Sequence, residues 1–329
     1  MDSAGKVYFS NPVYFADAFN FLLYGGERVI DPGRLRELDA TEVTAINGGN
    51  AKANVQKTRD LLRMWGAMED DNAVYVMLGL ELQGLVHYAM PVRSALYDAI
   101  GYANQVSNIA RSYRKDSREK EEGKEADVTV ENGTVKIKLT DAEFLSGLRK
   151  GDRLVPIVTA VVHPGDEPWD GPRSLLDMLD VPDVRLRRFL SDYRLNLISP
   201  ADMAEEEFDK FGTDLGDAMW LMKHKSSDGA TLLESEKKNM KVSRETARFL
   251  NAAINLNAAI NLKIDYEEEQ GDVDMCNSFQ RRYKEIEVTS AIKAFRYDGA
   301  SDEEIVERVT KLCDVDREYV LALLAQKQE

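Results

Sequence analysis

The sequence predicts an α/β protein with a helical C-terminal region. Two apolar runs, residues 73–83 and 154–162, have the length and composition of buried strands. Residues 11–24 and 91–114 carry helix signals at their ends, and residues 200–262 have mostly helical patterns. Strands that alternate with helices favour a central mixed sheet of about four main strands flanked by helices.

Length and composition limit the class of protein. A chain of 329 residues is long enough for one large core with an appendage, or for two domains. Its two cysteines, Cys276 and Cys313, are too few for a disulfide framework, and no basic start followed by an apolar stretch resembles a signal peptide. The longest apolar run is about 10 residues, against roughly 20 for a membrane span. We therefore expect a cytoplasmic protein with no membrane partner.

The net charge of −15 argues against a protein that coats nucleic acid non-specifically, since such binding depends on clustered Lys and Arg. A nuclease remains compatible with this charge. It needs only a local basic rim, and its acidic metal site repels DNA until a cation binds.

The first predicted helix is apolar almost all round, so it is expected to be buried. It begins with an Asn at the N-cap position followed by a Pro, and two glycines follow it as a stop signal. Asp17 and Asn20 are its only interior polar residues, and their spacing places them on one side. Residues 27–57 are mixed in composition and are predicted to be irregular with short helices.

A hairpin is predicted from residues 58–65 and 73–83, joined by the polar segment GAMEDDN. If the turn is centred between Asp70 and Asp71, Asp60 faces Glu81. On the second strand one face carries valines and leucines, and the other carries Met77, Gly79, Glu81 and Gln83. Two acids and an amide thus converge on one patch.

This patch has the composition of a site for a hard divalent cation. Asp60 and Glu81 would supply carboxylate oxygens, and the backbone carbonyl of Leu82 and waters would complete the coordination. Gln83 would orient a water or a phosphate oxygen, and Asp17 would supply a third acid. Such a site suits metal-assisted phosphodiester hydrolysis. The alternative is that Glu81 and Gln83 lie at a strand end facing solvent and that Asp17 is merely capped or paired.

The helix at residues 91–114 is predicted to pack through an apolar stripe, with Arg93 and Tyr97 on another side. This stripe consists of Val92, Leu96, Ile100, Ala103 and Val106. Arg93 is a candidate for a substrate phosphate, although packing under the site is the competing interpretation. Residues 115–126 are expected to be a charged connection, and Asn132-Gly133 marks a β-hairpin insertion near 127–139.

Five segments in order resemble a known family: FADAFNFLL, TRDLL, VMLGLELQ, VHYAMPVRSALYDAIGYA and LVPIVTAVVHPGDEPWDGPRSLLDML. The chain resembles the Rpn recombination-promoting nucleases, which are also classed as transposases of the PD-(D/E)XK nuclease family, over about residues 8 to 195. The resemblance implies a restriction-endonuclease-like core. It also implies that Asp60 is the core aspartate, that Glu81 and Gln83 form the E-x-K element, and that Asp17 is the acid of the first helix.

The chain departs from the family pattern at three positions. Arg59 stands in place of Pro, and Gln83 in place of Lys, so the site has one cation fewer beside the phosphate. His163 stands where an aromatic residue is expected. The usual three-acid transposase core is not part of the resemblance, which favours a nuclease.

We therefore expect a nuclease-like domain at residues 1–225 and a helical region at 226–329. The expected function is Mg²⁺-dependent endonucleolytic cleavage of DNA, with Mn²⁺ able to substitute and with homo-oligomers formed through the helical region. One alternative is a catalytically silent relative that binds protein partners, which the net charge of −15 favours. Another is a ribonuclease or a nuclease of branched DNA.

Overall fold

The computed structural model describes residues 2–38, 41–48, 51–58, 60–66, 75–121, 140–165, 167–224, 229–254 and 271–325. The contacts within the chain define two compact units. Unit 1 comprises residues 1–28, 163–169 and 199–329, and unit 2 comprises 29–162 and 170–198. These boundaries differ from the expected division at residue 225, because the first helices group with the C-terminal region. The predicted hairpin at 127–139 and Arg59 lie outside the described residues.

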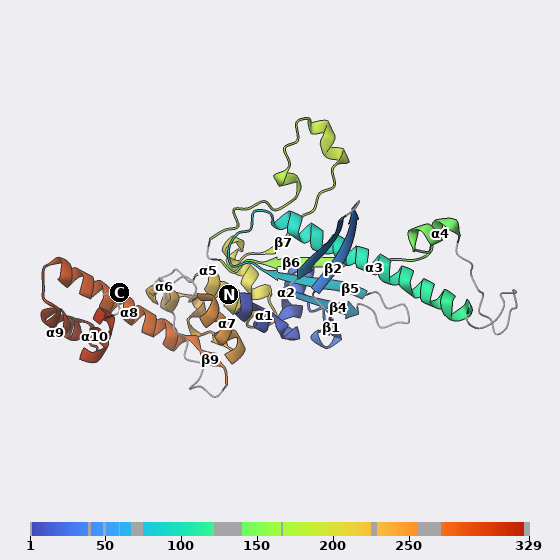
Figure 1. The fold of residues 1–329 in the computed structure, drawn as a ribbon. Helices are drawn as coiled ribbons and strands as arrows, with labels where there is room; N and C mark the ends of the chain where they lie inside the picture. Colours follow the sequence, from blue (N-terminus) through green and yellow to red (C-terminus); the bar gives the residue numbers. More distant parts are fainter. Residues whose placement is uncertain are drawn as a thin grey trace. The chain divides into compact units, whose positions relative to one another are not determined.

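Unit 2 is built on a mixed sheet of five strands in the order β1-β4-β5-β6-β7 (Figure 1). The strands are β1 (Leu35–Glu37), β4 (Leu61–Gly66), β5 (Tyr75–Leu82), β6 (Ile157–Val162) and β7 (Asn196–Ile198). The pairs β1–β4 and β4–β5 are antiparallel, and β5–β6 and β6–β7 are parallel. The expected α/β class, mixed sheet and helical C-terminal region are thus confirmed.

The pairing of β4 with β5 follows the predicted register. Leu61 faces Leu80 and Leu62 faces Gly79. The same register, extended by one residue, places Asp60 opposite Glu81. The two faces of β5 are also as expected: Leu78 and Leu80 are fully buried on one face, and Glu81 lies on the other. The polar turn itself falls largely outside the described residues.

The prediction for residues 27–57 is wrong over most of its length. After the short helix η1 (Pro32–Arg34) and β1, strands β2 (Thr41–Gly48) and β3 (Ala51–Thr58) form a separate antiparallel hairpin. Gly48 faces Ala51 at one end of this pairing, and Thr41 faces Thr58 at the other. Residues 41–58 lack a regular alternation of apolar and polar side chains. From sequence, strands of this composition are difficult to distinguish from a loop.

Helix α3 (Met90–Glu121) packs on the face of the sheet that carries Glu81. It starts one residue before the predicted helix and continues through residues 115–121, which were expected to be a connection. The predicted apolar stripe is wrong in part: Ile100 is buried, but Val92 is 46% exposed and Ala103 is exposed. The buried positions in the part of α3 whose side chains are described are Met90, Pro91, Ser94, Tyr97, Asp98, Ile100 and Gly101. A polar face is buried because the sheet supplies hydrogen-bond partners, which an apolar periodicity does not report.

Residues 170–198 carry the chain from unit 1 back into the sheet as β7. They contain the short helices η2 (Leu176–Met178) and η3 (Val184–Phe189). An isolated antiparallel bridge joins Ser174 to Arg194 at the base of this excursion. Elsewhere in unit 2, α4 (Asp141–Ser146) begins with a capping box between Thr140 and Glu143.

Unit 1 consists mostly of helices. Its elements before the last three helices are α1 (Asp2–Ser10), α2 (Pro12–Tyr24), η4 (Pro200–Asp202), η5 (Glu205–Lys210), α5 (Leu215–Lys223), α6 (Gly229–Glu234), η6 (Glu236–Asn239), β8 (Lys241–Val242), α7 (Arg244–Ile254) and β9 (Val273–Asp274). The expected helical character of residues 200–262 holds for the described part, interrupted by β8.

Helix α2 has the predicted boundaries and capping. The side chain of Asn11 accepts a hydrogen bond from the Val13 N–H, and Gly25 ends the helix with φ 63°. Gly26 follows with φ 99°, and a Cβ there would lie 2.2 Å from the Lys210 carbonyl oxygen. The second glycine of the stop signal is therefore required by close packing as well as by its φ angle.

His163 has a packing role in unit 1. Its ring is buried and meets the Trp169 ring edge-on, with 5.3 Å between the centroids. A Cβ at Gly165 would lie 2.6 Å from His163 Nε2. The imidazole therefore packs as a buried ring between Gly165 and Trp169.

The C-terminal helices are α8 (Met275–Tyr297), α9 (Asp302–Cys313) and α10 (Arg317–Ala325). Helices α9 and α10 form a helical hairpin that packs on α8. A capping box between Ser301 and Glu304 begins α9. Their shared core contains Val288, Ile292, Ile305, Val306, Val309, Cys313, Val320 and Leu324. Among the described segments, no helix has both the length and the apolar character that crossing a membrane requires.

Replacing Ile305 by Ala should test this C-terminal core. The fully buried side chain leaves a cavity, which we expect to cost about 3 kcal/mol of unfolding free energy. Leu312→Ala, on the same helix but 65% exposed, should change stability by less than about 0.5 kcal/mol. Urea unfolding followed by circular dichroism compares the two. Equal effects would show that this core does not form in solution.

Candidate functional site

The candidate site lies where β4 begins and β5 ends. Asp60 immediately precedes β4, and its Oδ2 accepts a hydrogen bond from the Leu82 N–H at 2.8 Å. This bond continues the β4–β5 pairing beyond the last strand pair. The register thus fixes the Asp60 carboxylate beside the last residues of β5.

Glu81 is the buried acid of this site. Its side chain is 0% exposed, so the interpretation that Glu81 faces solvent at a strand end is wrong. The Arg93 guanidinium lies 3.2 Å from it, measured from Nη2 to Oε2. Burial of a carboxylate without compensation would cost several kcal/mol. Arg93, one turn into α3, supplies that compensation.

Arg93 and Tyr97 form one polar unit on α3. The Arg93 Nε–H donates to the Tyr97 hydroxyl at 2.9 Å. Burial by itself would lower the pKa of Arg93, but the Tyr97 hydroxyl and the negative charges of Glu81 and Asp60 raise it. Burial and the charge of Glu81 raise the pKa of Tyr97, against the opposing effect of Arg93. The guanidinium is therefore charged and the phenol neutral near pH 7.

A second buried acid holds α3 against the sheet. Asp98 accepts hydrogen bonds from the Thr159 hydroxyl on β6, at 2.7 Å, and from the Tyr193 hydroxyl. The Gln105 side chain exchanges two hydrogen bonds with the backbone of Val155, at 2.7 and 3.0 Å. These bonds fix the position and rotation of α3, and thereby the position of Arg93 beside Glu81.

The backbone of β5 presents a carbonyl toward Asp60. The Gln83 N–H donates to the Val162 carbonyl of β6, so residue 83 faces β6 and residue 82 faces β4. The N–H and C=O of one strand residue point to the same side, and the Leu82 N–H donates to Asp60. The Leu82 carbonyl therefore also points toward Asp60. Gln83 is half-buried and follows Glu81 on the same face of the strand.

The oxygens at this site fit a cation such as Mg²⁺, which is commonly bound through one or two carboxylates and several waters. Asp60 and Glu81 would hold it, with the Leu82 carbonyl beside them. No group of three or more His, Cys, Asp and Glu side chains suited to a metal occurs in the part of the chain that the structure describes.

Asp17, the third predicted acid, has a structural role that is visible within unit 1. Its carboxylate accepts from the Gly212 N–H at 2.7 Å, the Thr213 N–H at 3.0 Å and the Thr213 hydroxyl. Arg28 donates to the Gly212 carbonyl at 2.8 Å. These contacts hold the turn that begins α5. They account for a buried acid in α2 without a metal, and its role at the cation stays a prediction.

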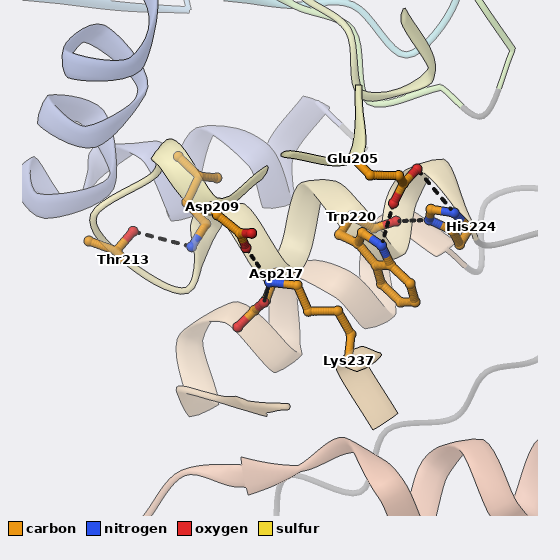
Figure 2. A network of polar contacts seen from close by, with 8 residues as sticks. Glu205, Asp209, Thr213, Asp217, Trp220, His224 and Lys237 are labelled. Atoms are coloured by element: carbon orange, nitrogen blue, oxygen red, sulfur yellow. Dashed lines mark hydrogen bonds and ion pairs between the residues drawn. The ribbon is translucent and has the colours of Figure 1, made fainter. Parts of the chain in front are cut away.

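Unit 1 contains another network of charged side chains (Figure 2). The Lys237 ammonium bridges Asp209 at 3.0 Å and Asp217 at 2.9 Å. Glu205 accepts from the Trp220 indole N–H at 2.9 Å and lies 2.9 Å from the Lys223 ammonium. This network links η5, α5 and η6, so it acts as a set of cross-links between short helices.

His224 ends this network without the geometry of a catalytic base. Its ring stacks on Trp220, with 4.3 Å between centroids, and its Nδ1 lies 3.0 Å from the Trp220 carbonyl oxygen. Its Nε2 lies 3.5 Å from Glu205. Both ring nitrogens therefore lie against groups of its own packing environment, and a stabilising role is sufficient to explain the residue.

Sequence reasoning overlooked the polar face of α3. Ser94, Asp98, Gly101 and Gln105 recur at helical spacing and lie toward the sheet. A stripe of small and polar residues with a period of three to four was the available signal. It was missed because apolar residues alone were used to find the inner face of the helix.

Nothing matched this chain in comparisons with models of protein families, with curated proteins and with solved structures. The assignment of a function therefore depends on the geometry of the site and on the resemblance of its motifs.

The role of Asp17 is testable by Asp17→Asn. The amide oxygen cannot accept all three hydrogen bonds, so we expect a loss of about 1–3 kcal/mol in unfolding free energy. Asp31→Asn serves as the control, because Asp31 is an exposed helix N-cap where Asn serves equally well. Urea unfolding measures the stability, and calorimetric titration measures the affinity for Mg²⁺. Lost Mg²⁺ binding at unchanged stability would instead identify Asp17 as a ligand.

Proposed function

We propose that this protein is a Mg²⁺-dependent endonuclease of the PD-(D/E)XK type that cleaves DNA. The observation that carries the proposal is the β4–β5 register, which brings Asp60 and the buried Glu81 to one face of the sheet. A pair of acids at the end of adjacent strands, beside a backbone carbonyl, suits a cation that binds phosphate oxygens. The motif resemblance supports the same chemistry.

Each residue at the site has a distinct role in this proposal. Asp60 is positioned by the Leu82 N–H and Glu81 by Arg93, so both carboxylates are held before any ligand arrives. A bound Mg²⁺ would lower the pKa of an attacking water and stabilise the charge that develops on the phosphate. Gln83 would hold that water or a phosphate oxygen by hydrogen bonding. Asp17 stays a candidate for an assisting role at the metal.

Arg93 gives the site a second property. Without a cation its guanidinium offsets the charge of Glu81, and it is also close enough to the site to meet a phosphate. A guanidinium binds phosphate oxygens well because of its planar set of donors. We propose that Arg93 shifts from Glu81 toward the substrate phosphate when the cation takes its place. This partly replaces the positive charge that Gln83 lacks.

The proposal includes the setting of the enzyme. Cys276 and Cys313 are free thiols, which fits a reducing cytoplasm. Contact between copies through the C-terminal helices is part of the proposal, and Leu312 and Leu321 are exposed apolar side chains there. The competing function is a protein-binding module that keeps the fold and lacks catalysis.

Purified protein should nick or linearise plasmid DNA with Mg²⁺ or Mn²⁺, and EDTA should abolish the activity. Glu81→Gln should lower the cleavage rate by at least about 100-fold, because it removes a charged ligand. Glu303→Gln, an exposed residue of α9, should cleave at the wild-type rate. A panel of supercoiled, branched and single-stranded DNA and of RNA identifies the substrate. The absence of cleavage across the panel would favour the protein-binding module.

Arg93→Gln should have opposite effects on the cation-free site, in which Arg93 pairs with Glu81, and on the cation-bound site. Without a cation, Glu81 loses its ion pair, which should cost about 3 kcal/mol because Glu81 is buried and Arg93 is only partly exposed. Mg²⁺ should then raise the melting temperature of this variant more than that of the wild type, since no guanidinium competes for Glu81. Thermal melts over a Mg²⁺ series measure both effects. Equal Mg²⁺ shifts in the two proteins, or none, would contradict a cation at Glu81.

A further inference from the structure

The excursion between β6 and β7 carries an exposed basic and aromatic segment. We call residues 175–193 the arm; it contains η2 and η3 and appears as the yellow-green loop in Figure 1. Its tip has the sequence VRLRRFL at residues 184–190, with three arginines and no acid. Within a chain of net charge −15, this is a local reversal of sign.

The base of the arm is closed and fixed. The Leu175 N–H donates to the Tyr193 carbonyl at 2.9 Å, and the Leu195 N–H donates to the Arg173 carbonyl at 2.8 Å. The Tyr193 hydroxyl also donates to Asp98 of α3. The base of the arm is therefore attached to unit 2 by hydrogen bonds on both of its sides.

Three of the four acids of the arm hold its own turns together, and the fourth, Asp180, is exposed. Asp177 accepts from the backbone N–H groups of Arg173 and Ser174, and Asp183 caps η3 and pairs with Arg185. Asp192 accepts from the Leu176 N–H and from Arg194. Asp183 offsets the charge of Arg185, so the positive charge of the tip is that of Arg187 and Arg188.

Arg187 and Arg188 are left with their charges outward. Both are exposed, and no acid pairs with either of them among the residues that the structure describes. The Arg188 guanidinium lies 4.8 Å from the centroid of the Phe189 ring, and that ring is 73% exposed. Val184, at the other end of η3, is 76% exposed. A basic pair beside an open aromatic ring matches what single-stranded nucleic acid requires, namely phosphate contacts and a surface for a base.

The base of the arm is attached to the sheet close to the proposed site. Asn196, the first residue of β7, faces Ala160 of β6, and Ala160 faces Leu80 beside Glu81. Two strand spacings separate these backbones, or about 10 Å. The base of the arm therefore belongs to the same sheet as the two carboxylates, two strands from β5.

We propose that the arm binds a single-stranded stretch of the substrate nucleic acid, with Arg187 and Arg188 on backbone phosphates and Phe189 stacked on an unpaired base. This inference rests on the proposed function, which makes nucleic acid the substrate. The contacts at the arm are independent of the cation, so binding there persists in EDTA.

Fluorescence anisotropy in EDTA tests the arm without cleavage. The probes are a labelled 20-nucleotide DNA strand, the duplex of the same sequence, and the strand in the presence of excess polyglutamate. Arg187→Gln/Arg188→Gln should lower the slope of log affinity against log salt by about 1.4, the value for two phosphate contacts on a single strand. Phe189→Ala should weaken strand binding about 10-fold and duplex binding less.

The matched control is Lys293→Gln/Arg317→Gln, which removes the same charge from exposed positions on α8 and α10. It should leave the salt slope unchanged. Equal slopes for the arm variant and the wild type, or no strand binding by the wild type in EDTA, would overturn the arm assignment even if plasmid cleavage occurs. Polyglutamate competing as well as the unlabelled strand, with no effect of Phe189→Ala, would assign the arm to an acidic protein instead. Strand binding lost only in the arm variants, with no cleavage by the wild type, would support the arm and count against the nuclease.

Discussion

The buried carboxylate of Glu81 is the constraint on which unit 2 depends. A charge at a fully buried position of a central strand is stable only if an opposite charge or a ligand compensates it. Arg93 provides the compensation, so α3 must cross the sheet with its first turn at the end of β5. The position of the helix is thus coupled to the electrostatics of one strand residue.

The remainder of α3 is adapted to this requirement. Asp98 binds Thr159 and Tyr193, and Gln105 binds the backbone of Val155, so the helix is attached at several points along the sheet by directed bonds. Apolar packing alone would permit rotation of the helix about its axis. Hydrogen bonds with defined donors and acceptors permit one orientation, which also positions Tyr193 at the base of the arm. The candidate site and the arm are therefore held by the same helix.

Unit 1 combines buried apolar helices with polar links. Helices α2 and α5 are buried along most of their length. Polar contacts join Asp17 to the turn before α5, and Lys237 to both Asp209 and Asp217. Such links define the path of segments that lack regular secondary structure. The C-terminal helices, also in unit 1, share an apolar core, which fits their regular sequence pattern.

The sequence by itself determined the elements whose signals are local. The caps of α2 and α9, the apolar strands and the register of β4 on β5 all follow from residues close together in the chain, so Asp60 could be placed opposite Glu81. Tertiary structure alone decided the partners of the polar residues. Arg93 pairs with Glu81, and Asp17 binds residues 212 and 213, because burial in a packed protein requires each polar group to find a partner, and those partners lie far away in the sequence. The same reason explains why the inner face of α3 was misassigned: its polar residues are buried only because the sheet brings acceptors and donors to them.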